Sequence, residues 1–244
     1  MSSLLLLGTG GGGGAPFDPV NLPGLEWLYE ADMTGADLVL SGSDVTTWGL
    51  ASLIQFTEAL GSKRPEFVAD DGDGKEAVRF DGIDDSLRKT SLTVSSSFTS
   101  MHVSRNSKTN AQITEHGDAD PGFYNGFVST VAASFFRVDR GANQSTFSIS
   151  IDGTDDVWRL WVQEHNGTHA SHQAYIDGVI QTRIPSTSDD IGISDITRTM
   201  SLGAENGTAR FQQGAQRFGL LCSPMLSAQD RIDASNYALA KWVT

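Results

Sequence analysis

The chain has 244 residues, a hydrophobic fraction of 39% and a formal net charge of −13 at pH 7. Its 17 Lys and Arg against 30 Asp and Glu are too few to neutralise the phosphates of a nucleic acid or to hold an anionic membrane surface. With 12 Phe and 5 Trp it can build a substantial core, so we expect an acidic folded protein that binds neither nucleic acid nor membrane.

The N-terminus combines four leucines with a glycine tract. This stretch is too short to span a bilayer, which takes about 20 apolar residues, and it lacks the positive region of a secretory signal peptide. Because glycine loses the most backbone entropy on ordering, we expect residues 1–20 to form an extended arm that orders only against a partner. The residues expected to dock are Leu4, Leu5, Leu6, Leu7, Gly10, Gly11, Gly12, Gly13 and Gly14.

Residues 21–244 read as one domain of short strands joined by tight turns. Asp-Gly and Asn-Gly dipeptides recur along this region, and both tolerate the positive φ that two-residue hairpins require. The segment 173–180 reads as one such hairpin, centred on Asp177-Gly178. The clearest strand-like stretches are Ala77–Phe80, Phe98–Val103, Ser134–Val138, Thr146–Ile151 and Val157–Val162.

Only the C-terminal segment has the pattern of a helix, over about residues 227–242. Ser227 and Asp230 have the spacing of a capping box, which satisfies free amide groups at a helix start. The lone cysteine, Cys222, precedes this segment in an apolar run and predicts a buried, unreactive thiol. The residues expected on the inward face of the helix are Ile232, Ser235, Leu239 and Trp242.

Several stretches occur in an order known from one domain family. Arg64-Pro65 precedes EAVRFDGIDDSL at residues 76–87, SFTSMHV follows at 97–103, YIDG stands at 175–178, and 211–242 form an ending with a C-terminal helix. Together, over about residues 22–243, these stretches resemble concanavalin A-like, laminin-G-like jelly-roll domains. The resemblance implies an all-β jelly-roll sandwich with one C-terminal α-helix.

A jelly roll behind a leucine-glycine segment also resembles virion proteins of tailed phages. The resemblance implies a non-enzymatic structural protein, either a head decoration or a tail or fibre component. It would be made in the host bacterial cytoplasm and displayed on the virion surface as a homo-oligomer. The arm would then bind a major capsid or tail subunit. The alternative is a carbohydrate-binding adhesin or lectin module for host-surface glycans, and a third reading is a glycan-degrading enzyme.

A glycan surface needs an exposed aromatic ring beside hydrogen-bonding side chains. In the strand-like stretch near residue 160, alternate residues fall on opposite faces, and one face must be core. We expect Trp158 on the core face. The other face could present Trp161 to a sugar, with Arg159 and Gln163 beside it. Early tryptophans at positions 27 and 48 are expected in the core.

The sequence predicts no catalytic residue. Glycoside hydrolases with this jelly roll use an E-x-D-x-x-E strand, whose carboxylates flank the sugar bond. Glu30 and Asp32 are the nearest approach, but the final glutamate is missing. A Gly-x-Ser-x-Gly nucleophile motif is absent as well. We therefore expect a protein that is not an enzyme.

Two groups have some resemblance to metal sites. His165, His169 and His172 lie close together but lack the glutamate of an H-E-x-x-H helix, so we interpret them as a polar loop. The acidic loop 70–74 lacks the register of an EF-hand, and a solvated hairpin is the preferred interpretation there. Because laminin-G-like domains often hold calcium at their rim, calcium remains the one cofactor considered. The candidates for calcium are Asp71, Asp73, Asp118 and Asp120.

Overall fold

The computed structural model describes residues 17–58, 60–108, 112–116, 122–127, 134–140, 143–190, 196–204 and 211–244. The proposed docking residues 4–14 and the calcium candidates Asp118 and Asp120 lie outside these ranges. The last residues of the expected arm are already part of the fold. Asp18 caps the 3-10 turn η1 (Pro19–Asn21), and the ring centroid of Phe17 lies 5.8 Å from that of Tyr237.

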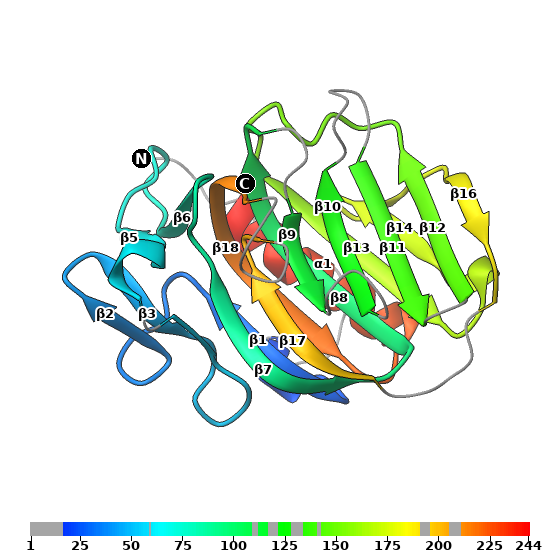
Figure 1. Ribbon diagram of the computed structural model, residues 1–244, viewed down its shortest axis with the longest axis horizontal. Helices are drawn as coiled ribbons and strands as arrows, with labels where there is room; N and C mark the ends of the chain where they lie inside the picture. The colour runs from blue at the N-terminus through cyan, green and yellow to red at the C-terminus, as the bar shows by residue number, and fades with distance from the viewer. Residues whose placement is uncertain are drawn as a thin grey trace, which may run out of the picture.

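The described strands form two antiparallel layers that pack face to face (Figure 1). We call one the helix-covered sheet and the other the opposite sheet. The helix-covered sheet consists, in spatial order, of β1 (Leu25–Glu30), β18 (Gln213–Cys222), β8 (Ser97–Asn106), β13 (Arg159–Asn166), β14 (Gln173–Ile176) and β15 (Val179–Ile180). The opposite sheet consists of β4 (Phe56–Thr57), β7 (Leu87–Val94), β17 (Ile196–Leu202), β9 (Gln112–His116), β10 (Gly122–Phe127), β11 (Ser134–Arg140), β12 (Asn143–Ile149) and β16 (Ile184–Ser188).

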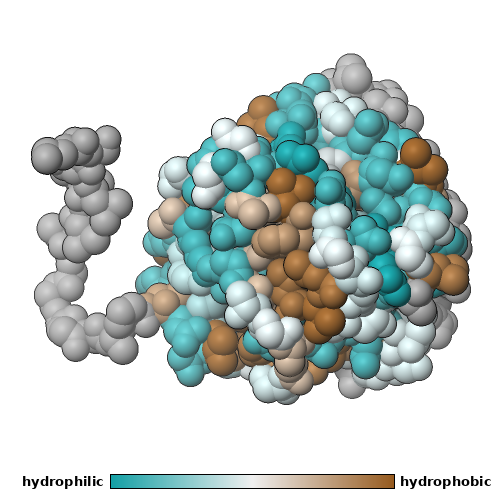
Figure 2. Space-filling view, turned by 90° about the vertical axis from the view of Figure 1, so that its left-hand side faces the viewer, coloured by the Kyte–Doolittle hydropathy of each residue, from teal (hydrophilic) through white to brown (hydrophobic). Residues whose placement is uncertain are grey.

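A small extension joins the two sheets at one end of the sandwich. Its strands are β2 (Leu38–Ser41), β3 (Asp44–Trp48), β5 (Glu66–Val68) and β6 (Ala77–Asp81). β6 pairs with the beginning of β18, while β3 leads through β4 to β7. Figure 2 faces this end: hydrophilic residues cover much of it, and apolar residues gather near its middle. Val39 and Leu40 of β2 are among the exposed apolar residues of the extension.

The C-terminal helix α1 (Ala228–Ala238) begins where the sequence predicts and continues into a π-helical turn, η4 (Leu239–Val243). The hydroxyl of Ser227 accepts the amide of Asp230 at 3.1 Å and donates to the carboxylate of Asp230 at 2.7 Å. The predicted inward face is only partly right, because Ile232 is 42% exposed. The residues that α1 and η4 bury are Ala234, Ser235, Ala238 and Trp242.

The all-β sandwich with one C-terminal helix is thus confirmed. The expected hairpin is formed by β14 and β15, and Asp177 and Gly178 both have positive φ, at 52° and 80°. Trp27 and Trp48 are fully buried, as predicted. Cys222 is buried as well, and burial raises the pKa of its thiol to about 12, which keeps it protonated. None of the described helices is long and apolar enough to cross a bilayer.

Candidate functional site

The expected sugar platform at Trp161 is wrong. Trp161 is 1% exposed, and Gln163 is fully buried. The indole packs against Phe136 and Phe147 of the opposite sheet, and its Nε1 donates to the carbonyl of Ser104 at 3.3 Å. Both faces of β13 are covered, because one faces the opposite sheet and the other lies under α1.

Arg159 does not complete such a platform either. Its guanidinium forms a two-pronged ion pair with Asp155, with both N–O distances 2.5 Å. Its carbon Cζ lies 6.0 Å from the ring centroid of Trp161. The three residues therefore belong to the core and its rim.

Glu30 and Asp32 both form ion pairs with Lys241, near the C-terminus. Glu30 accepts the hydroxyl of Tyr237 at 2.7 Å, and its carboxylate lies 3.2 Å from Nζ of Lys241. The same ammonium lies 3.0 Å from the carboxylate of Asp32. Both carboxylates thus share the ammonium of Lys241, and Nε1 of Trp242 donates to Glu30 at 3.3 Å. The two are therefore held by structural contacts and not arranged as an acid and a base on opposite sides of a sugar bond.

Two of the three histidines meet at a serine, and the third packs against one of them. Ser145 Oγ lies 2.7 Å from Nδ1 of His169 and 2.8 Å from Nδ1 of His172. The ring of His172 also contacts that of His165 edge-on, with centroids 5.3 Å apart. Burial, and the neighbouring His165, hold the pKa of His172 well below 6.5, so this imidazole is neutral. Among the described residues, the three do not bring their ring nitrogens together as metal ligands.

The acidic loop 70–74 is held onto the helix-covered sheet by arginines. The side chain of Asp71 is fully buried and forms ion pairs with Arg79 at 2.6 Å and with Arg105 at 2.9 Å. Asp73 accepts from the guanidinium of Arg217 at 2.8 Å. Asp71 and Asp73, two of the calcium candidates from the sequence, are therefore paired with guanidinium groups.

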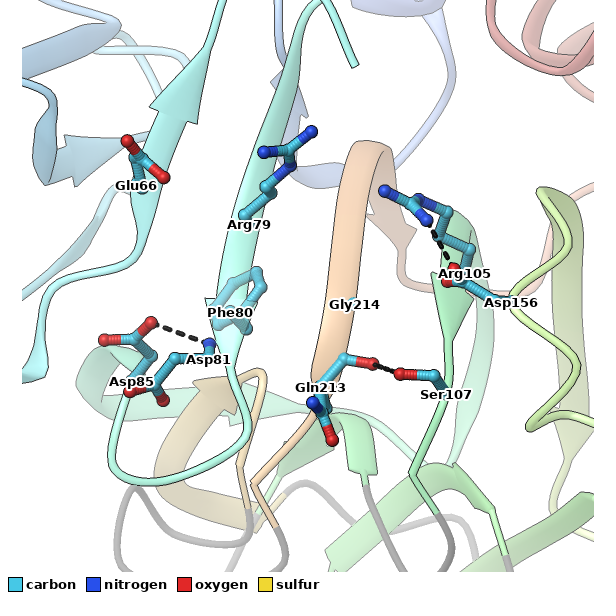
Figure 3. A pocket seen from close by; sticks show the side chains of 10 residues that line it. All are labelled: Glu66, Arg79, Phe80, Asp81, Asp85, Arg105, Ser107, Asp156, Gln213 and Gly214. Atoms are coloured by element: carbon cyan, nitrogen blue, oxygen red, sulfur yellow. Dashed lines mark hydrogen bonds and ion pairs between the residues drawn. The ribbon is translucent and has the colours of Figure 1, made fainter. Parts of the chain in front are cut away.

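Two of these arginines, Arg79 and Arg105, border a pocket of about 340 Å³. Arg79 of β6 and Arg105 of β8 are both register partners of Ala215 of β18, so the three side chains lie in one row on one face. β18 passes between the two arginines in Figure 3. The residues lining the pocket are Glu66, Arg79, Phe80, Asp81, Asp85, Arg105, Ser107, Asp156, Gln213 and Gly214.

Local chemistry explains how these side chains are placed. Arg105 connects Asp71 to Asp156, whose carboxylate it contacts at 2.7 Å. Ser107 Oγ donates to the carbonyl of Gln213 at 3.1 Å, which joins β8 to β18 beside the pocket. Gly214 is required by close approach, because a Cβ there would stand 2.2 Å from the carbonyl oxygen of Arg105. The donors and acceptors are therefore fixed on adjacent strands.

An acidic turn between β6 and β7 forms one end of the pocket. Asp81 accepts the amides of Ile83 and Asp84, while Asp85 accepts the amide of Asp81 at 2.8 Å. One carboxylate oxygen from each of Asp81, Asp84 and Asp85 lies within 4.8 Å of the others. The pKa of Asp85 is raised to about 7, mainly by burial and in smaller part by the charges of Asp81 and Asp84. Among the described residues, the carboxylates spaced closely enough to bind one cation are thus those of Asp81, Asp84 and Asp85, and not those of Asp71 and Asp73.

The indole ring of Trp158 packs against the guanidinium groups of Arg105 and Arg217. Arg105 Cζ lies 5.5 Å and Arg217 Cζ 3.9 Å from the ring centroid of Trp158. Arg217 is fully buried, and its guanidinium also donates to the carbonyl of Trp242. Stacking on an indole restrains a guanidinium in orientation. The sequence predicts Trp158 on the core face. In the structure Trp158 is half-buried, so it lies at the border of the core.

A second pocket of about 520 Å³ lies over β4 and β7. Arg88 forms an ion pair at 3.0 Å with Glu58, whose side chain is nearly buried. The second pocket resembles the first pocket in one respect: in each, a half-exposed arginine is paired with a buried carboxylate. It offers fewer carboxylates and lacks a second arginine among the residues that line it.

Comparison with solved structures yields β-sandwich domains. Domain 4 of an extracellular GH43 arabinanase from Geobacillus stearothermophilus, in complex with arabinotriose, is 14% identical, with a TM-score of 0.52 over 88% of this chain and 100% of that domain. The binding domain of Paraclostridial Mosquitocidal Protein 1 is 13% identical, with a TM-score of 0.57 over 86% of this chain and 51% of the other. The receptor binding domain of botulinum neurotoxin D is 11% identical, with a TM-score of 0.52 over 88% and 53%.

The likeness is one of fold. The chain spans about half the length of the two toxin domains and the whole of the arabinanase domain. No protein-family model matches the sequence, and no curated protein sequence matches it. None of the three structures is a virion protein, so the virion interpretation of the N-terminal segment stays a prediction.

Proposed function

We propose that this chain is a non-enzymatic carbohydrate-binding domain whose site is the pocket over β6, β18 and β8. The observation that carries the proposal is the combination of two oriented guanidiniums with carboxylate, amide and hydroxyl groups in one pocket. Each sugar hydroxyl both donates and accepts, so a sugar needs both kinds of partner at fixed positions. The volume of about 340 Å³ falls within the usual range of ligand pockets.

The fold neighbours support this reading more than the virion reading. One of them is a domain solved with arabinotriose, and the other two are binding domains of toxins. The ionic partners of Glu30 and Asp32 disfavour the third reading, a glycan-degrading enzyme. Docking of residues 4–14 on a virion subunit stays a prediction, which deletion of residues 1–14 would test through particle incorporation. A homo-oligomeric state stays a prediction as well.

The test is a glycan array followed by calorimetry with a matched pair of variants. Arg79→Ala removes a donor that borders the pocket, whereas Arg88→Ala removes an arginine of similar exposure that is also paired with a buried carboxylate. We expect Arg79→Ala to weaken glycan binding by about tenfold or more, as the loss of a charged hydrogen bond does, and Arg88→Ala to leave it within about twofold. Absence of binding to every sugar, or equal loss in both variants, would refute the proposal.

A further inference from the structure

We infer that the pocket selects neutral, hydroxyl-rich glycans and discriminates against glycans that carry carboxylates. The inference rests on the proposed function and concerns the ligand class of the same site. Four carboxylates line the pocket, from Glu66, Asp81, Asp85 and Asp156, against the guanidiniums of Arg79 and Arg105.

The two guanidiniums are already compensated by protein carboxylates. Both form ion pairs with Asp71, whose side chain is fully buried directly beside them. Arg105 forms a second ion pair with Asp156. An acidic sugar would have to compete with these contacts, so the arginines present donor hydrogens without presenting a free positive charge.

The carboxylates keep their excess when Lys108 is included. Lys108 donates to the carbonyl of Gly82 in the acidic turn, and it adds one positive charge at this end of the pocket. Counting Asp71, five carboxylates then face three cations. The net charge of −13 for the chain acts in the same direction at longer range.

The accessible groups suit a hydroxyl-rich ligand. Glu66 is exposed, and the side chain of Asp156 is 44% exposed, so both can accept hydrogen bonds from hydroxyls. The side chain of Arg79 is 44% exposed and can donate to a hydroxyl while it stays paired with Asp71. Figure 3 shows Glu66 and Asp156 at opposite sides of the pocket, with Arg79 between them. A neutral sugar can contact both acidic sides without electrostatic cost.

The ionisation of Asp85 is consistent with this field. The pKa of Asp85 is raised to about 7, mainly by burial and in smaller part by the charges of Asp81, Asp84 and Asp44. A ligand carboxylate placed beside Asp85 would lose solvation and would meet the charges of the same three carboxylates.

The experiment compares galactotetraose with tetragalacturonate, which have sugar rings of the same configuration but differ in charge, by calorimetry on the full chain at pH 8. We expect the neutral ligand to bind at least about tenfold more tightly, a difference that should shrink as NaCl rises because salt screens repulsion. If galactans prove to be the wrong sugar, another neutral oligosaccharide found on the array and its uronic acid counterpart take their place.

Variants locate the source of the discrimination. Glu66→Gln and Asp156→Asn should each raise the affinity for the acidic ligand, relative to the affinity for the neutral ligand, by about three- to tenfold, because each removes a repelling charge. Asp189→Asn removes an exposed charge outside the pocket lining and is expected to change neither. Tighter binding of the acidic ligand would overturn the inference while leaving carbohydrate binding intact. Failure of every glycan to bind would instead refute the proposed function.

Discussion

Replacing Asp85 by asparagine should stabilise the protein, and most strongly above pH 7. Asp85 is 7% exposed, and its carboxylate accepts the amide of Asp81. Asparagine has nearly the same shape and keeps an oxygen that can accept this amide. The substitution therefore removes the buried charge and leaves the hydrogen bond in place.

The size and the sign of the change in the free energy of unfolding follow from the pKa of Asp85. Burial raises this pKa from 3.8 to about 7, and at 1.36 kcal/mol per unit the ionised group costs the folded state up to about 4 kcal/mol. Between pH 3.8 and about pH 7, Asp85 keeps its proton in the folded state and has released it in the unfolded state. The free energy of unfolding of the wild type therefore falls as pH rises from about 4 to 7 and is then constant for this group.

The assay is urea denaturation of both proteins from pH 4.5 to pH 8. The Asp85→Asn protein should gain about 2–4 kcal/mol over the wild type at pH 8 and progressively less toward pH 4.5. Asp189→Asn, which removes an exposed carboxylate outside the pocket lining, is the control for the loss of one negative charge. Stability curves of wild type and Asp85→Asn that run parallel with pH would refute the reasoning.

Three further outcomes follow from the contacts. Trp161→Ala should cost about 3–5 kcal/mol in urea denaturation, because the ring is 1% exposed and leaves a cavity; a loss of glycan binding without loss of stability would restore it as a ligand contact. Asp73→Asn should cost about 1–3 kcal/mol, since it weakens the contacts of the buried guanidinium of Arg217; an unchanged denaturation midpoint would contradict this. Because the pKa of His172 is lowered by burial, unfolding free energy should fall as pH drops below 6.5, and His172→Gln should flatten that slope.

Much of the fold could be predicted because its signals are local. The Asp177-Gly178 turn and the Ser227 cap depend on residues within a few positions of one another, and both are confirmed. The fate of Trp161 depends on distant elements. Because side chains alternate along a strand, the sequence places Trp161 and Leu160 on opposite faces of β13. Only the assembled sandwich shows that the opposite sheet covers one of these faces and that α1 covers the other.

The pocket could not be predicted, because its parts come from separate strands. Asp71 meets Arg79 across 8 positions of sequence and Arg105 across 34, while Asp73 meets Arg217 across 144. Carboxylates in a glycine-rich loop have the same composition whether they bind a cation or a guanidinium. The register of β6, β18 and β8 decides between the two, and a single sequence carries little information on that register.

The most direct test of the central claim is the crystal structure of the domain with the neutral oligosaccharide that binds most tightly. We expect a sugar ring over β6 and β18, with hydroxyls within hydrogen-bond distance of Arg79 and of Asp156. A sugar bound elsewhere, for example beside Arg88 in the second pocket, with the first pocket holding only solvent, would contradict the account.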